Sequence, residues 1–276
     1  AAMTQNSALK SDISADSSYV DSDMRKIKHI KNQKGIVVST QNLFNSYNQL
    51  RINADLIQKN VEVMEAAANA AQTQASIGMA TQADVLKAQK NLQSIKSTQT
   101  ETLSSLETLR QNLCMMTGWS YNAQPEIKEV PQADLAAIDQ INLEGDRQKA
   151  LENNYDLQYS KRALNNMQEN STDKKNQERT VKNLEQSISA SMTNLYNDIQ
   201  QKKIAWQLAQ AELATEQQSM SAVETKRGLG MVSDLEYLQA QSSFLGKQIA
   251  ERTANMALFQ AVETYNWAVN GYLSQK

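Results

Sequence analysis

Residues that could carry catalysis are scarce in this sequence. His29 is the only histidine and Cys114 the only cysteine among 276 residues. One histidine and one thiol cannot supply the four nitrogen and sulfur ligands of a structural zinc site, and Cys114 has apolar neighbours at Leu113 and Met115. No glycine-rich loop follows a strand pattern, and the Glu-x-x-His motif of di-metal helical bundles is absent from the sequence. We therefore predict a protein that is not an enzyme and that binds neither a metal nor a cofactor.

The hydroxyl and carboxyl side chains that do recur at a fixed spacing point to helix capping. Thr81 is followed three residues later by Asp84, and Ser233 is followed three residues later by Glu236. This is the spacing of a capping box, in which the hydroxyl accepts from a backbone amide of the first helical turn and the carboxylate accepts from the amide of the cap. Each pair comes shortly after a glycine, a residue that readily ends a helix. We assign all four residues to helix caps.

The two capping sites belong to an internal duplication. Residues 78–89 align with residues 230–241 at an offset of 152, and apolar positions on both sides match at the same offset. Each aligned centre predicts a tight turn between two long helices. The predicted organisation is a single elongated helical domain over 1–276, with repeat 1 at about 8–118 (hairpin 36–117, tip 78–81), a linker at 119–143, and repeat 2 at about 144–271 (hairpin 178–270, tip 228–233).

Long helices with a coiled-coil pattern must position these turns. The arm before the first turn carries apolar residues at alternating steps of four and three: Leu43, Tyr47, Leu50, Ala54, Ile57, Val61, Met64, Ala68, Ala71 and Ala75. On the last arm two apolar stripes compete, Tyr237, Ala240, Phe244, Ala254, Leu258 and Tyr265 against Leu238, Leu245, Ile249, Met256 and Phe259. Two stripes imply neighbours on two sides, either within a four-helix core or within a closed ring of helices.

Composition supports an all-α fold and excludes several functions. Two prolines and eight glycines are too few for the frequent turns of a sheet-rich domain. Lysine and arginine number 28 against 30 for aspartate and glutamate, a net charge of −2, so nucleic acid is not an expected partner. No stretch reaches the ~20 apolar residues of a transmembrane helix, so no direct membrane span is expected. The first residues contain no signal-peptide pattern, but Ala1-Ala2-Met3 is compatible with a processed terminus, so export stays open.

From residue 36 to residue 276 the sequence resembles the TolC family of outer-membrane efflux proteins. The resemblance is carried by the two Gly-x-x-Thr/Ser-x-x-Asp/Glu-x-x-x-Ala tips, by the Leu-x-x-x-x-Gly helix end at 113–118, and by the Ala-Leu-Glu-Asn-Asn run at 150–154. It implies that three chains pack their hairpins into a tunnel and that the tips contact an adaptor protein or an ABC transporter. The tip positions carried over as expected partner contacts are Gly78, Met79, Ala80, Thr81, Gly230, Met231, Val232 and Ser233.

The sequence departs from that family where membrane strands would stand. A membrane strand needs ~9–11 residues of alternating apolar and polar character, whereas residues 165–179 are charged and amide-rich and residues 24–34 are basic. We therefore expect a member that lacks the β-barrel, either because its source envelope has no outer membrane or because the strands were deleted.

The leading functional interpretation is a non-enzymatic protein of the extracytoplasmic cell envelope, which acts as a conduit through oligomerised hairpins and their tips. The alternative keeps the fold without a channel, as a monomeric or dimeric helical spacer or binding module. Binding to a lipid surface is disfavoured, because no helix places lysine and arginine opposite a strongly apolar face.

Overall fold

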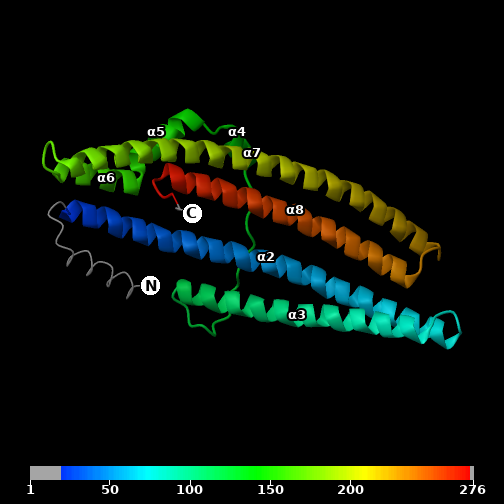
Figure 1. The fold of residues 1–276 in the computed structure, drawn as a ribbon. Coiled ribbons are helices and arrows are strands. Elements are labelled where there is room, and N and C mark those ends of the chain that lie inside the picture. The colour runs from blue at the N-terminus through cyan, green and yellow to red at the C-terminus, as the bar shows by residue number, and fades with distance from the viewer. Residues whose placement is uncertain (1–19, 274–276) are drawn as a thin grey trace. The chain divides into compact units, whose positions relative to one another are not determined.

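The computed structural model describes residues 20–273, and within this range it contains helices and no strand. The seven described helices are α2 (Ser22–Ser76), α3 (Gln82–Met116), α4 (Leu135–Asp139), α5 (Leu143–Asn153), α6 (Tyr155–Asn166), α7 (Thr172–Gly228) and α8 (Asp234–Val269) (Figure 1). The predicted all-α class is confirmed. The predicted start of repeat 1, near residue 8, lies outside the described residues.

The helices contribute to two compact units. Unit 1 combines Ala133–Gln201 with the described parts of Ala1–Gln41 and Phe259–Lys276, and unit 2 combines Asn42–Gln132 with Lys202–Leu258. The three long helices α2, α7 and α8 each run through both units. Each unit therefore draws on both halves of the duplicated sequence, and both interhelical turns belong to unit 2.

The helix α2 begins at Ser22, well before the hairpin start predicted at residue 36. Asp21 caps it, because its Oδ1 atom accepts from the backbone amides of Asp23 at 3.0 Å and Met24 at 2.9 Å. The basic residues that follow are good helix formers. The hairpin start was predicted at residue 36 because the coiled-coil periodicity begins there, but the helix itself extends further toward the amino terminus.

The same carboxylate of Asp21 also joins α2 to α6 within unit 1. Its Oδ2 atom accepts from Nδ2 of Asn166 at 2.8 Å and from Nε of Arg162 at 2.6 Å. These hydrogen bonds, that of Asn166 first, hold the pKa of Asp21 well below its usual range. Met24, one turn into the helix, is fully buried. The first turn of α2 is therefore fixed by tertiary contacts.

The boundaries of the second half also differ from the sequence-based ranges. The charged and amide-rich segment 165–179 contains only a short turn, and α7 begins at Thr172, before the hairpin start predicted at residue 178. The linker predicted over 119–143 contains the short helix α4, which Asp134 caps through the amides of Ala136 and Ala137. The helices α4 and α7 thus begin in polar segments, where apolar periodicity does not predict a helix.

The end of α8 packs closely against the junction between α5 and α6. Gly271 has a φ of 92°, and a Cβ atom added there would lie 2.1 Å from the backbone oxygen of Asn153. The backbone oxygen of Gly271 accepts from the amide of Tyr155 at 3.2 Å. The Nδ2 atom of Asn153 donates to the oxygen of Val269 at 3.1 Å. This backbone approach requires a glycine at position 271.

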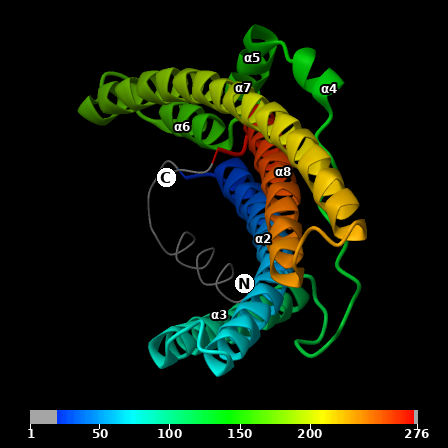
Figure 2. The ribbon, with the colours of Figure 1, turned by 90° about the vertical axis from the view of Figure 1, so that its right-hand side faces the viewer.

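Buried side chains lie on two faces of both α2 and α8. In α2, Val61 and Ala68 of the predicted seam are buried, but so are residues outside the seam: Asn48, Ile52 and Val63. In α8, Ile249 and Met256 come from one predicted stripe and Leu258 and Tyr265 from the other. Within unit 2, α8 runs alongside α2 in both views (Figure 1 and Figure 2). Both helices therefore have packed neighbours on two sides within a single chain.

Candidate interaction site at the hairpin tips

The turn between α2 and α3 is a Schellman motif. Gly78 adopts a φ of 77°, its amide donates to the oxygen of Ala75 at 3.1 Å, and the amide of Met79 donates to the oxygen of Gln74 at 2.8 Å. These two bonds satisfy carbonyl groups that the end of a helix would otherwise leave unpaired. The turn therefore has a defined backbone conformation.

The turn between α7 and α8 repeats this geometry. Gly230 has a φ of 71°, its amide donates to the oxygen of Arg227 at 2.9 Å, and the amide of Met231 donates to the oxygen of Lys226 at 2.9 Å. The donors and acceptors have the same relative spacing as in the first turn. The sequence duplication thus corresponds to two turns of the same structure, which lie at the same end of unit 2 (Figure 1).

Capping boxes start the helix after each turn. The Oγ1 atom of Thr81 accepts from the amide of Asp84 at 3.2 Å, and Oδ2 of Asp84 accepts from the amide of Thr81 at 2.9 Å. Ser233 and Glu236 make the same pair of bonds, at 3.2 and 2.8 Å. Hydrogen bonds from Thr81 lower the pKa of Asp84, and those from Ser233 lower the pKa of Glu236. Both carboxylates are occupied within the chain as hydrogen-bond acceptors.

Large apolar side chains point away from both turns into solvent. Met79 is 76 % exposed and Met231 is 70 % exposed, at equivalent positions of the two repeats. Ile77 and Leu229, one residue before each glycine, are 64 % and 70 % exposed. Both turns therefore expose apolar side chains on a defined backbone conformation.

The two tips differ in charge. At the second tip the guanidinium of Arg227 lies 3.1 Å from Oδ1 of Asp234 and stacks 3.6 Å from the ring centroid of Tyr237. At the first tip, the segment from Thr73 to Ala83 carries no charged residue. The two turns therefore share one backbone conformation but differ in surface charge.

The eight residues expected to contact a partner all lie in these two turns. Ala80 and Val232 are partly buried, and the other six are exposed. Sequence reasoning missed Ile77 and Leu229, although the 152-residue offset relates them and each directly precedes the glycine of its turn. An apolar residue in a predicted exposed turn was the signal that could have found them.

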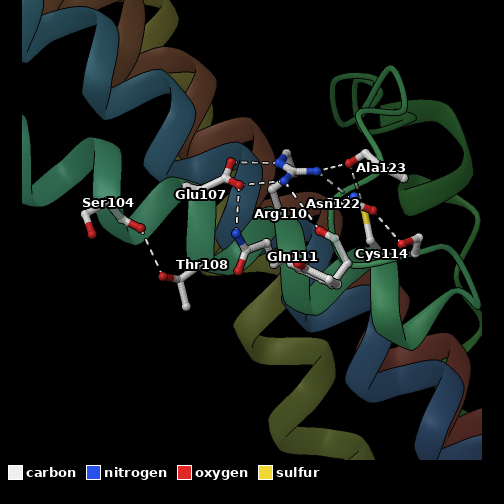
Figure 3. Close-up of polar contacts among 10 residues, drawn as sticks. Ser104, Glu107, Thr108, Arg110, Gln111, Cys114, Asn122 and Ala123 are labelled. Atoms are coloured by element: carbon white, nitrogen blue, oxygen red, sulfur yellow. Dashed lines mark hydrogen bonds and ion pairs between the residues drawn. The ribbon is translucent and has the colours of Figure 1, made fainter.

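A second set of polar contacts fixes the far end of the first hairpin, within unit 2. Arg110 donates to Oε2 of Glu107 at 2.7 Å through Nε, and also donates to the backbone oxygen of Ala123 (Figure 3). Gln111 donates to Oε1 of Glu107 at 2.8 Å. Cys114 is buried beneath this network and its Sγ lies 3.6 Å from the oxygen of Ala123. The loop after α3 is thus folded back onto the helix that precedes it.

The Glu107 carboxyl should titrate well below the ordinary pKa of a glutamate side chain. The hydrogen bonds from Arg110 and then Gln111 lower its pKa from 4.5 to about 2. Because the folded-state pKa is depressed, its contribution to stability is complete above about pH 4.5 and is lost as the pH falls through about 2. We expect a carbon-13 NMR titration of Glu107 to show this low midpoint. In the control Arg110→Gln the midpoint should move back toward 4.5, and an unchanged midpoint would contradict this account.

Two features are absent among the described residues, a cluster of metal ligands and a helix that could span a membrane. Among residues 20–273, no group of three or more histidine, cysteine, aspartate or glutamate side chains could hold a metal ion. None of the described helices is long and apolar enough to cross a bilayer.

Comparison with known proteins shows the fold. No model of a known protein family matches the sequence, and no curated protein sequence matches it. Among solved structures, the outer membrane protein VceC of Vibrio cholerae matches 91 % of this chain and 73 % of its own, with 12 % identity and a TM-score of 0.55. The CmeC outer membrane channel of Campylobacter jejuni matches over 92 % and 66 %, with 11 % identity and a TM-score of 0.57.

A structure of CusC, described in terms of transmembrane channel formation, matches over 99 % of this chain and 91 % of its own, with 13 % identity and a TM-score of 0.61. At such low identity these likenesses establish the fold alone. The expected fold, an all-α arrangement of helical hairpins like that of the TolC-type efflux channels, is confirmed.

Proposed function

We propose that this chain is a non-enzymatic component of an export conduit in the cell envelope, in which hairpins of several copies associate and the two tips dock onto an adaptor or a transporter. The observation that carries the proposal is the pair of structurally equivalent, capped turns that expose Met79 and Met231 at one end of unit 2. The likeness to outer membrane channels supports the same function.

Self-association is part of the proposal. Ile204 and Leu208, one turn apart on α7, are 66 % and 60 % exposed. Since residues four apart share a helix face, they form an apolar patch that a second copy of the chain can cover. A trimer of the 30.8 kDa chain is the expected assembly. Sedimentation equilibrium over a concentration series measures it, and a stable monomer or dimer would instead favour the spacer alternative.

The tips are tested by replacing Met79 and Met231 with aspartate. A buried carboxylate costs much more than a buried thioether, so we expect the double variant to bind a purified candidate adaptor at least about tenfold more weakly, a loss of ~1.4 kcal/mol. Leu103→Asp, a half-exposed position on α3 away from the turn, is the matched control and should bind normally. Equal affinity of the double variant and the control would refute tip docking.

A further inference from the structure

The segment between α3 and α4 lies across unit 2 as an extended strap, defined here as residues 123–131. It has no regular secondary structure. Pro125 and Pro131 restrict the residues before them, Gln124 and Val130, to extended conformations. Nine extended residues reach about 30 Å, which is enough to cross two helices packed 8–10 Å apart.

Arg51 attaches the strap to α2. Its Nη1 atom donates to the backbone oxygen of Ile127 at 2.8 Å, and its Nη2 atom lies 3.5 Å from Oε1 of Glu129. The Arg51 side chain is 28 % exposed, so the hydrogen bond to Ile127 and the ion pair with Glu129 are both partly shielded from water. A backbone carbonyl and a carboxylate two residues apart are a pair of acceptors that the arginine fork can bridge.

The strap then crosses to α8. Arg252 lies 3.8 Å from the same Oε1 atom of Glu129, and Asn255, which is buried, donates to the oxygen of Pro131 at 3.3 Å. Val130 packs against the buried cluster of Ile52, Ile249 and Met256, which joins α2 to α8. Glu129 therefore lies between two cations, one from each hairpin.

The distribution of these contacts is asymmetric. The strap is bound to the first hairpin at its start and in its middle, since Arg110 of α3 donates to the oxygen of Ala123 and Arg51 of α2 donates to the oxygen of Ile127. The strap contacts described for the second hairpin all come from α8. The strap thus holds the α8 arm of one hairpin against the other hairpin.

These contacts lie far from the tips. The hydrogen bond between α2 and α8 that lies closest to the turns within the described chain joins Ser242 Oγ to Asn60 Oδ1 at 2.5 Å. From Asn60 to the end of α2 at Ser76 is a length of ~24 Å at 1.5 Å per residue. A small rotation about the strapped region is therefore amplified at the tips.

We propose that the strap sets the separation of the two tips and that Arg51 is the residue that positions it. Loss of the Arg51 bridge releases the middle of the strap, so that α8 and the tip it carries move relative to the first hairpin. The importance of the tip separation for docking rests on the proposed function. The separation itself is a property of the chain alone and can be measured without any partner.

The test is a distance measurement between spin labels attached at Gln82→Cys, the first residue of α3, and Gln239→Cys, in the second turn of α8, both exposed. Cys114 is buried and stays unlabelled. Labelled chain is diluted with unlabelled chain, so that only distances within one chain are recorded. We expect Arg51→Ala to shift the mean distance by about 5 Å or more, or to broaden its distribution about twofold, as follows from a lever of this length.

Three variants make the result decisive. Glu126→Gln removes an exposed charge from the same strap and should leave the distribution unchanged. Arg51→Lys, which cannot bridge both acceptors, should give an intermediate distribution. Glu129→Gln, which keeps the Ile127 acceptor and removes the carboxylate that faces Arg51 and Arg252, should also give an intermediate distribution.

A melting curve for each variant separates positioning from stability. If Arg51→Ala lowers the melting temperature and leaves the tip distance unchanged, Arg51 has only a structural role and the proposal is wrong. If Glu126→Gln gives the same shift as Arg51→Ala, the effect is not specific to the bridge, and the proposal fails too. A normal adaptor affinity for the tip variants would overturn the proposed function and would leave this result standing.

Discussion

Gly271→Ala is expected to lower the free energy of unfolding by more than about 3 kcal/mol. The left-handed conformation costs alanine ~1–2 kcal/mol, and the added Cβ atom would lie 2.1 Å from the backbone oxygen of Asn153. Relief requires the end of α8 to move away from the junction of α5 and α6, which breaks the bond from Tyr155 to Gly271. Urea unfolding monitored by circular dichroism measures the loss.

Two other glycines are matched controls for this substitution. Gly118 has a φ of 85° and ends α3 with a Schellman motif like those of the two interhelical turns. Nothing lies within 4 Å of a Cβ atom added to it. Gly118→Ala should therefore cost only the conformational ~1–2 kcal/mol. Gly246, inside α8 and also without a neighbour, should be neutral or slightly stabilised by alanine. Equal losses for Gly271→Ala and Gly118→Ala would contradict the role assigned to the close approach.

Trp206→Ala is expected to destabilise the protein by about 3–5 kcal/mol, the usual range for removing a buried tryptophan. Trp206 of α7 is buried, and its Nε1 atom donates to Oε1 of Glu251 of α8 at 2.6 Å. The substitution removes both the packing and the hydrogen bond. Thermal unfolding is the appropriate measurement, with the truncated side chain expected to leave a cavity between the two arms of the second hairpin.

Two further variants show which property of Trp206 causes this loss of stability. Trp206→Phe keeps most of the volume and loses the hydrogen bond to the Glu251 carboxylate, so a cost of about 1.5–3 kcal/mol is expected. Ile204→Ala, two residues away and largely exposed, should change the stability by less than about 0.5 kcal/mol. A loss for Ile204→Ala as large as that for Trp206→Ala would show that the helix, rather than the tryptophan, is sensitive.

The turns could be predicted from sequence because their determinants are local. Gly78, Thr81 and Asp84 lie within seven residues, and the bonds that they make join residues at most five apart. The repetition of this set 152 residues later excludes a chance match. Fold class was predictable for the same reason, since apolar periodicity and the scarcity of glycine and proline are properties of each segment by itself.

The second buried face of α2 was not predictable, because its partners are distant in sequence. Asn48, Ile52 and Val63 lie outside the heptad seam, yet they are buried. Gln49 of α2 donates to Thr253 of α8 at 2.9 Å, across 204 residues. The strap was missed likewise: two prolines identified a linker, but nothing in the sequence paired Glu129 with Arg51. Tertiary contacts of this kind leave no periodic signal.

The discontinuity of unit 1 has a consequence for the order in which the protein can be assembled during synthesis. Its core requires the segment after Phe259, where Tyr265 and Ala268 are buried. The first hairpin, by contrast, is complete once α3 has emerged. Because synthesis proceeds from the amino terminus, this hairpin can form early. The helices α5 and α6 can pack into unit 1 only after the end of α8 has been synthesised. A nascent chain arrested before residue 259 should be sensitive to protease at α5 and α6 and resistant within the first hairpin.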